Sequence, residues 1–256
     1  MPAEFLESAL LRESGFRHAF FTRRGGVSEG PYASLNFSRS VGDDPERVTQ
    51  NFALAGETLG LGPERIHFLA QVHGNAAVGL NGDESASATA EREGDALVSR
   101  APGLACGVRI ADCVPILVAD EQSGAVAAIH AGWRGIVRGV IEAGLARLRE
   151  TAGGDVKLVA ALGPHIRLWS FEVGEDVAEE LAAVSPVPCV VRRDGMKPHV
   201  RLDNIVRAKL VAAGVAAERI DDVGGCTFSE DERFFSYRRD GKTGGRHLAA
   251  IVTRPA

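Results

Sequence analysis

Residues 104–148 decide the fold class, and they read LACGVRIADCVPILVADEQSGAVAAIHAGWRGIVRGVIEAGLARL. Three short apolar runs, at 104–110, 114–119 and 125–130, are separated by Asp, Cys, Gly or Ser, a pattern typical of adjacent buried strands. Apolar residues then recur at helical spacing from Ile136 to Leu148, with charged residues on the opposite face. The stretch therefore predicts a three-stranded core with a helix packed on it.

Further elements are expected on both sides of this core. Asp44 and Pro45 mark the start of a helix over 45–59, and Gly60 marks its end. The polar, small-residue-rich segment 81–94 is expected to be a surface loop. We expect strands at 65–70, 157–162, 233–237 and 247–252, and helices near 174–183 and 203–213. The predicted class is mixed α/β, with helices covering a sheet.

Composition excludes several classes of protein. Of the 256 residues, 45% are apolar and 25% are charged, which excludes intrinsic disorder and suits one large domain or two closely packed halves. Lys and Arg number 29 against 34 Asp and Glu, and they are scattered, so nucleic acid is not an expected partner. No stretch approaches the roughly 20 apolar residues that cross a bilayer, and no export signal opens the chain. A cytoplasmic protein without a membrane partner is expected.

Three segments each place a metal-binding type of side chain at the end of an apolar run. They are QVHG at 71–74, ADCVP at 111–115 and IHAGWRG at 129–135, and they contribute His73, Cys113 and His130. The ends of strands are where sheets present functional groups. Two imidazoles and one thiolate suit Zn²⁺ and leave a fourth position for water or substrate, as catalytic zinc sites require. Neighbouring glycines allow the backbone to approach these groups closely.

The same residues permit a rival chemistry. Cys113 is a candidate nucleophile activated by His130 or His73, with Asp112 orienting the base. The spacing of the three groups matches no short metal motif. The residues by themselves therefore leave a metal site and a cysteine nucleophile as alternatives.

Other segments give weaker signals. Two arginine-rich turns, TRRGGVS at 22–28 and SYRRDG at 236–241, could bind an anion through forked guanidinium donors. Glu172 precedes a predicted helix, where a carboxylate ordinarily interacts with the helix N-terminus. Four cysteines with no C-x-x-C pair are too few for a disulfide framework. The following residues are expected to be structural or ordinary: His18, His67, His165, His199, Cys106, Cys189, Cys226, Phe20, Phe21, Phe234 and Phe235.

In order along the chain, these segments resemble the laccase-domain or multicopper polyphenol oxidase family, which is associated with zinc-dependent purine nucleoside phosphorylase activity and with peptidoglycan editing. The resemblance runs from about Phe20 to Val252. Its motifs are FTRRGGVSEGPYASLNFS, VGDDPERV, QVHG, EGDALVSR, ADCVPILVAD, HAGWRG, ALGPHI with FEVG, CTF and FFSYRRDGKTGGR. The combination of QVHG, ADCVP and HAGWRG is highly specific.

The resemblance implies a ligand set, a fold and an activity. His73, Cys113 and His130 correspond to the family's zinc ligands. The implied fold is a single three-layer α-β-α domain with mixed sheets, spanning residues 1–256. The implied reaction is phosphorolysis of adenosine, inosine or guanosine to base and ribose 1-phosphate, with methylthioadenosine cleavage and adenosine deamination as further activities. Copper chemistry fits poorly, because one His-Cys-His site lacks the histidines of a multicopper cluster, although copper binding in vitro is compatible with it.

The sequence departs from the family pattern at three positions. The family often has Arg where this chain has Phe52, so one guanidinium that could bind an anion is absent. It often has Cys where this chain has His165, and Tyr where this chain has Phe171, so a hydroxyl donor is missing beside Glu172. These departures bear on phosphate affinity and substrate preference more than on the metal.

A mechanism for phosphorolysis assigns a role to each candidate residue. Arg134 and Arg238 would neutralise the anion that attacks C1′, beside a metal held by His73, Cys113 and His130. Asn36, Asp95 and Glu172 are candidates for stabilising the departing purine near N7. For deamination the same site would direct water to C6, with a carboxylate moving the proton. His130 and Cys113 thus act in catalysis as well as in metal binding, and Arg238 also binds substrate.

Two further hypotheses belong to other classes. One is a cysteine- or zinc-dependent hydrolase that edits peptidoglycan precursors, with Cys113 as nucleophile. The other is a non-catalytic zinc module, which would need a fourth protein ligand, and none is evident among Cys106, Cys226 and His165. If the protein is a phosphorylase, the expected partners are purine nucleosides and phosphate. The expected oligomeric state is a monomer or weak homo-oligomer.

Overall fold

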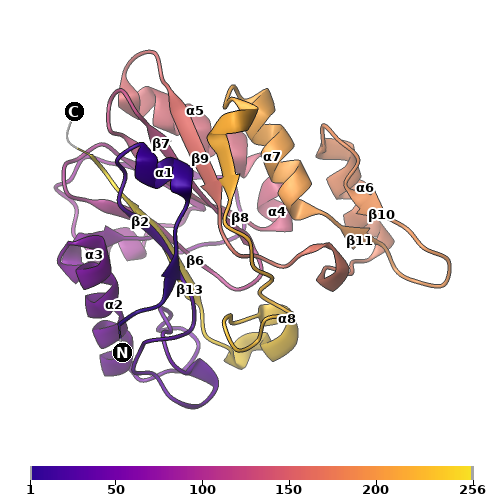
Figure 1. Ribbon diagram of the computed structural model, residues 1–256, viewed down its shortest axis with the longest axis horizontal. Coiled ribbons are helices and arrows are strands. Elements are labelled where there is room, and N and C mark those ends of the chain that lie inside the picture. The colour runs from indigo at the N-terminus through magenta and orange to yellow at the C-terminus, as the bar shows by residue number, and fades with distance from the viewer. Residues whose placement is uncertain (1, 255–256) are drawn as a thin grey trace.

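The computed structural model describes residues 2–254, and two mixed sheets organise it (Figure 1). One sheet has five strands in the order β1-β2-β13-β6-β3: Phe5–Leu6, His18–Phe21, His247–Val252, Ala105–Ile110 and Ile66–His67. The other has six strands in the order β12-β9-β7-β8-β5-β4: Ile220–Asp222, Leu158–Leu162, Val114–Asp120, Val126–Ala131, Ala96–Ser99 and Ala77–Leu80. A separate antiparallel pair joins β10 (Val190–Val191) to β11 (His199–Val200). Both large sheets contain parallel and antiparallel neighbours.

The two large sheets pack face to face through a shared apolar core. Side chains that meet there include Phe20, Val108 and Ile251 from one sheet and Leu97, Leu117 and Val159 from the other. They alternate along their strands with residues that face outward, which is the period-two pattern of a strand. Each fully buried side chain of this size contributes about 1.5–3 kcal/mol.

Helix α2 (Pro45–Leu59) covers the outer face of the five-stranded sheet. The Asp44 side chain caps it by accepting a hydrogen bond from the Glu46 N–H, and Gly60 ends it in the left-handed conformation with φ 64°. Its buried face presents Val48, Phe52 and Leu59, among other residues. The helix predicted over 45–59 is confirmed.

The remaining long helices cover the outer face of the six-stranded sheet, on the other side of the molecule (Figure 1). They are α5 (Val140–Ala152), α6 (Glu175–Val184) and α7 (Leu202–Ala212), and the short helix α4 (Trp133–Val137) lies beside them. Helix α5 packs closely enough that a Cβ on Gly144 would lie 2.6 Å from Cδ1 of Ile129 in β8. The other short α-helices are α1 (Ala9–Glu13), α3 (Ala86–Ala90) and α8 (Tyr237–Asp240).

The predicted mixed α/β class, with helices on both sides of mixed sheets, is confirmed, and the β layer between the helices is two sheets thick. The strands predicted at 114–119, 125–130, 157–162 and 247–252 and the helices near 174–183 and 203–213 are present within one or two residues. In residues 2–254 no helix is both long enough and apolar enough to span a bilayer.

Several local predictions were wrong. The three strands expected at 104–110, 114–119 and 125–130 are present, but they are not neighbours in one sheet: β6 belongs to the five-stranded sheet, where it pairs with β13 and β3, while β7 and β8 pair in the other sheet. Residues 233–237 form no strand, because this segment is a turn that leads into α8. The helix expected over 136–148 is broken at Gly139, whose φ is 83°, and the expected loop 81–94 contains α3. The strand expected at 65–70 shortens to β3.

Candidate metal centre and arginine-lined cleft

His73, Cys113 and His130 converge from three loops and strand ends into a possible metal site. His73 follows β3, Cys113 lies in the turn between β6 and β7, and His130 lies near the end of β8. Their ligand atoms all lie within 4.8 Å of one another, with 3.9 Å between Cys113 Sγ and His73 Nε2. The two imidazole rings stand nearly perpendicular, with an interplanar angle of 75°. Two nitrogens and one sulfur at this separation suit a tetrahedral metal with an open fourth position.

The backbone at this site adopts conformations that side chains disfavour. His73 has φ 57° and Asp112 has φ 88°, and within residues 2–254 they are the non-glycine residues with positive φ. Such conformations cost of order 1–3 kcal/mol each and persist where the surrounding structure holds them. The strain therefore coincides with the loops that carry the candidate ligands His73 and Cys113, and functional sites are where such strain concentrates.

Gly132 shows how tightly the three ligands are enclosed. A Cβ at this position would lie 2.9 Å from Cys113 Sγ and 2.9 Å from His73 Cδ2. Gly132 also starts α4, so the backbone passes from His130 into that helix directly beside the ligands. Any larger residue would displace the thiolate or the imidazole.

Asp95 is the residue that orients both histidines. Its Oδ1 accepts hydrogen bonds from His130 Nδ1 at 2.8 Å and from the His73 N–H at 3.0 Å, and its Oδ2 accepts one from the Gly74 N–H at 2.7 Å. Burial works to raise the pKa of this carboxyl, but the hydrogen bonds from His130 and the backbone prevail and lower it. With Nδ1 engaged, His130 turns Nε2 toward the cluster, as in carboxylate–histidine–metal arrangements.

Cys113 and His130 shift each other's protonation. Burial works to raise the pKa of the Cys113 thiol, but His130 and His73 outweigh it and lower the pKa to about 6. Burial works to lower the pKa of His130, but Cys113 and Asp95 outweigh it and raise the pKa to about 9. The thiolate is therefore available at neutral pH, which serves a metal ligand or a nucleophile.

The three ligands open onto a cleft of about 510 Å³ that is rich in arginine. Four guanidinium groups line it, and within residues 2–254 none of them forms an ion pair with a carboxylate. The lining consists of Ser38, Ser40, Gln71, His73, Arg109, Ile110, Ala111, Asp112, Cys113, His130, Trp133, Arg134, Ile166, Phe171, Tyr237, Arg238 and Arg246. A chain whose formal charge is −5 thus keeps a positive cleft that attracts anions.

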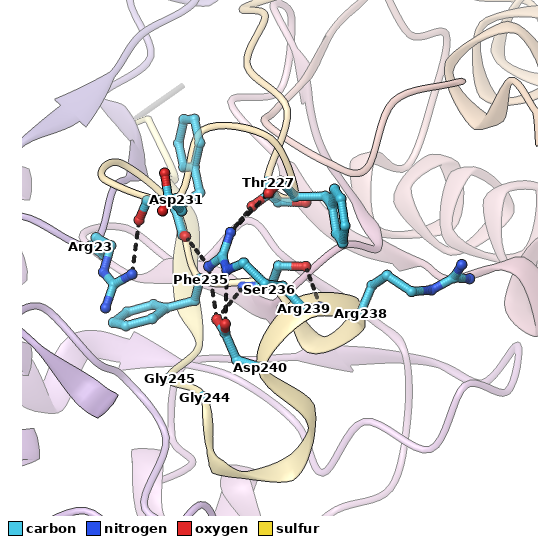
Figure 2. Close-up of polar contacts among 12 residues, drawn as sticks. Arg23, Thr227, Asp231, Phe235, Ser236, Arg238, Arg239, Asp240, Gly244 and Gly245 are labelled. Carbon is cyan, nitrogen blue, oxygen red and sulfur yellow. Dashed lines mark hydrogen bonds and ion pairs between the residues drawn. The ribbon is translucent and has the colours of Figure 1, made fainter. Parts of the chain in front are cut away.

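Neighbouring arginines in the segment after Thr227 have opposite roles (Figure 2). The Arg239 guanidinium lies inside the segment, donating to the carbonyls of Thr227 and Phe234 and pairing with Asp240. The Arg238 side chain points away from that network, lines the cleft, and donates to the Glu172 carbonyl at 2.8 Å. Arg239 therefore holds the segment together, while Arg238 faces the cleft.

The other arginine-rich turn is occupied with structural contacts. Arg23 donates to the carbonyls of Ala33 and Asp231 and lies over the Phe235 ring, 4.5 Å from its centroid. Figure 2 shows its contact with Asp231. Arg24 pairs with Glu232. This turn holds the two ends of the chain together rather than lining the cleft.

The remaining candidates lie at different distances from the cluster. Arg134 lines the cleft and stacks on Trp133, 4.5 Å from the ring centroid. The Glu172 side chain pairs with Lys197 at 3.3 Å and lies outside the cleft lining. Asn36 is fully buried, and its amide contacts Ser38, Asp43 and the backbone N–H of Arg246. Asn36 and Asp95 thus lie behind cleft residues and support them.

Asp112 does not orient an imidazole, contrary to the rival hypothesis. Its carboxylate accepts hydrogen bonds from Thr227 Oγ1 and from the Arg238 N–H, both at 2.7 Å. It anchors the segment that carries Arg238 to the loop that carries Cys113. Cys106, Cys189 and Cys226 are buried, unpaired thiols, and the side chains of His18, His67, His165 and His199 lie outside the cleft lining.

Two arginines of the cleft were missed as functional candidates in the sequence. Arg109 lies within an apolar strand, and Arg246 ends the motif GKTGGR. The available signal was a charged residue inside a strand that is otherwise apolar, because a buried guanidinium needs a partner or a ligand.

Comparison with known proteins places the chain in a family. It is 38% identical to a purine nucleoside phosphorylase of Bacteroides thetaiotaomicron over 95% of this chain and 94% of that protein, and 39% identical to the purine nucleoside phosphorylase YfiH of Escherichia coli over 90% of each. The crystal structure of YlmD from Geobacillus stearothermophilus matches with a TM-score of 0.87 and 32% identity, covering 99% of this chain and 100% of that one. That of the Bacillus licheniformis hypothetical protein YfiH matches with a TM-score of 0.90 and 26% identity, covering 99% and 97%. The family model described as multi-copper polyphenol oxidoreductase laccase matches residues 17–254, and the chain belongs to that family.

Proposed function

We propose that this protein is a zinc-dependent purine nucleoside phosphorylase that cleaves adenosine, inosine or guanosine with phosphate. The observation that carries the proposal is a possible three-ligand site opening onto a cleft whose four guanidinium groups form no ion pair with a carboxylate of residues 2–254. Phosphorolysis needs an anionic nucleophile beside the reacting carbon, and such a cleft can hold one. The names of the relatives in Bacteroides thetaiotaomicron and Escherichia coli support the same reaction.

The donor set fits zinc better than a copper cluster. Two imidazoles and a thiolate match the ligands that zinc prefers, and Asp95 supplies the outer carboxylate that commonly accompanies a zinc-bound histidine. Within residues 2–254 no second group of this kind accompanies them, whereas multicopper oxidation needs several clustered sites. Bound zinc would supply Lewis acidity to an oxygen at its open position.

The residues of the cleft would position the phosphate and the nucleoside for the reaction. Guanidinium groups hold phosphate so that one oxygen faces C1′ of the nucleoside, and that oxygen bonds to C1′ as the C1′–N9 bond breaks. The purine leaves with the bonding electrons and takes a proton at N7 from water, because the Glu172 side chain pairs with Lys197 outside the cleft lining. Phe171 and Trp133 offer apolar walls for the base at the same cleft. Methylthioadenosine differs at the 5′ position, so we propose that it uses the same C1′ chemistry.

Adenosine deamination is proposed as a second reaction of the same site. Water would add to C6 and ammonia would leave, without any change at C1′. The two reactions differ in their need for phosphate, so phosphate dependence separates them.

A cysteine-dependent hydrolase acting on peptidoglycan precursors is the second candidate. It is favoured by the Cys113 thiol beside the His130 imidazole. Burial works against both shifts, but the attraction between the two groups outweighs it. The pKa of Cys113 is lowered to about 6, and the pKa of His130 is raised to about 9. Asp95 would then orient the base. This candidate predicts activity that survives chelation and is lost on alkylation.

Product analysis by mass spectrometry tests the proposal. Zinc-loaded protein is incubated with adenosine, with and without phosphate, beside Cys113→Ala. We expect adenine and ribose 1-phosphate only when phosphate is present, with both products lost in the variant. Inosine as the sole product would identify a deaminase instead. Absence of turnover in zinc-loaded protein would refute the phosphorylase and move the test to peptidoglycan precursor amides.

A further inference from the structure

Arg109 lies in β6, and Arg246 is the residue immediately before β13, the neighbouring strand of the five-stranded sheet. Arg109 in β6 faces Leu248 of β13, and His247 faces Ile110. Arg246 comes two residues before Leu248, so by strand alternation both guanidinium groups stand on the same face, diagonally adjacent. Both line the cleft that contains Cys113 and His130.

Neither guanidinium has the partner that a half-buried cation ordinarily needs. Arg109 stacks over the Phe68 ring at 4.4 Å and makes one long contact to the Leu69 carbonyl at 3.4 Å, while its Nε is buried without any partner. Arg246 donates from Nη1 to the carbonyls of Gly244 and Gly245. In the described part of the chain neither forms an ion pair, although Asp112 and Asp240 act on Arg246 from a longer distance.

Burial and mutual repulsion make this pair costly without an anion. Burial and the repulsion from Arg246 and Arg39 together lower the pKa of Arg109 to about 10, with burial the largest cause. Burial also lowers the pKa of Arg246. Two like charges held in a low-dielectric setting destabilise the fold unless a ligand of opposite charge joins them.

Dedicated contacts hold the two arginines in position. The Gln71 amide pairs with both backbone groups of Arg109, donating to its carbonyl and accepting from its N–H, each at 2.8 Å. Asn36 Oδ1 accepts from the Arg246 N–H at 2.9 Å and from the Ser38 N–H at 3.0 Å. Gln71 lies two residues before His73, so the position of Arg109 is fixed to a metal-binding loop.

We propose that Arg109 and Arg246 form the oxyanion subsite of the cleft and bind inorganic phosphate, with Ser38 as a neutral donor. Arg134 and Arg238, which the sequence suggests for phosphate binding, then contact other parts of the substrate. The proposal rests on the proposed function for the identity of the anion as co-substrate, while the subsite itself rests on the contacts above. It assigns Asn36 and Gln71 as positioning residues for the pair.

Calorimetric titration of inorganic phosphate into zinc-loaded protein tests the subsite without requiring turnover. The variants are Arg109→Gln, Arg246→Gln and the charge-preserving Arg246→Lys, beside Arg134→Gln and Arg238→Gln. Arg147→Gln is the matched control, because it removes one positive charge from a different groove, where Arg147 pairs with Glu150. Zinc content and thermal unfolding are measured for every variant, so that a folding defect is recognised.

We expect Arg109→Gln and Arg246→Gln each to raise the Kd for phosphate at least about tenfold, a loss of about 1.4 kcal/mol. Arg246→Lys loses less, since it keeps the charge, and Arg147→Gln stays within about twofold of the parent. The proposal is overturned if both Gln variants bind phosphate within about twofold of the parent. It is also overturned if Arg134→Gln or Arg238→Gln costs as much as they do.

Two further arms separate the subsite from the proposed function. Adenosine 5′-monophosphate is titrated in parallel, and binding of this nucleotide without binding of inorganic phosphate contradicts the proposal. If phosphate binds through the two arginines but adenosine is not cleaved, the subsite stands and the phosphorylase proposal fails. If adenosine is cleaved with an unchanged KM for phosphate in both Gln variants, the phosphorylase proposal stands and the subsite fails.

Discussion

Charged side chains at the two ends of strand β7 differ in whether they have partners of opposite charge. At its start, beside Cys113, four arginines line a cleft without carboxylate partners among the described residues. Just past its end, Glu121 accepts hydrogen bonds from Ser14 Oγ at 2.7 Å and Lys157 Nζ at 2.8 Å and pairs with Arg219. Burial works to raise the pKa of Glu121, but Lys157, Ser14 and Arg219 lower it to about 2.

The charged groups at one end of β7 stabilise the fold, whereas those at the other end are positioned to bind a ligand. The Glu121 cluster matches its cations with an anion of the chain, so its contribution appears as stability. The cleft arginines have no ion-pair partner among residues 2–254 and lie beside strained loops, so under the proposed function their contribution is expected to appear when an anion binds. Mutations at the two ends are therefore expected to change different measurements.

The largest effect is expected from Cys113→Ala. Removing the thiolate leaves two imidazoles, so zinc stoichiometry falls and phosphorolysis drops by about a thousandfold or more. Zinc analysis and initial rates on the same sample check this. Cys189→Ala, which removes a buried thiol outside the cleft, serves as the control and is expected to keep both zinc and turnover. Full turnover in Cys113→Ala would contradict the assignment of Cys113 as a zinc ligand needed for the reaction.

Asp95→Asn should weaken zinc binding by about 10- to 100-fold, because the amide keeps one oxygen for three strong donors from His130, His73 and Gly74. Competition with a zinc-sensitive dye measures the affinity. Unchanged zinc affinity with slower turnover would instead assign Asp95 to substrate.

Glu121→Gln should lower the free energy of unfolding by about 1–2 kcal/mol while zinc content and turnover stay within about twofold. The folded pKa of about 2 lies below the unfolded value, so the stabilisation is fully present above about pH 5 and is lost as the pH falls toward 2. Denaturant unfolding of both proteins between pH 7 and pH 3 measures the difference. A difference that grows as the pH falls would contradict this assignment.

The smallest effect is expected from Lys157→Gln. Lys157 is 64% exposed in its pair with Glu121, so solvent screens it and the loss is about 0.5 kcal/mol or less. Arg219→Gln, at the more buried partner, should cost more. Equal losses of stability for the two variants would show that the exposure of each cation does not determine its contribution to the Glu121 cluster.

Local chemistry made parts of this fold predictable from the sequence. The helix over Pro45–Leu59 is marked by its Asp44 cap and by Gly60, and the strand over His247–Val252 by an unbroken apolar run. The convergence of His73, Cys113 and His130 followed from strand ends together with the family motifs. For the helix and the strand the signal lies within a few residues of the feature, whereas the convergence of the three side chains needed the combination of motifs along the chain.

Features that depend on distant partners were not predictable. The strand Ala105–Ile110 was assigned to the wrong sheet because its partner, His247–Val252, lies near the other end of the chain. Residues 233–237 contain three aromatic residues, which favour a strand, but Arg239 donates to the Phe228 and Phe234 carbonyls and holds the segment in an irregular conformation. Asp95 and Asn36 carried a functional signal, yet their positions behind the ligands and behind Arg246 depend on tertiary contacts.

Crystals of the zinc-loaded protein grown with phosphate would test the central claim most directly, by anomalous diffraction at the zinc edge. The account predicts one anomalous peak bonded to His73, Cys113 and His130, and tetrahedral density contacting Arg109 and Arg246 in the same cleft. A peak bonded to other residues, or phosphate held by Arg134 and Arg238 alone, would contradict it.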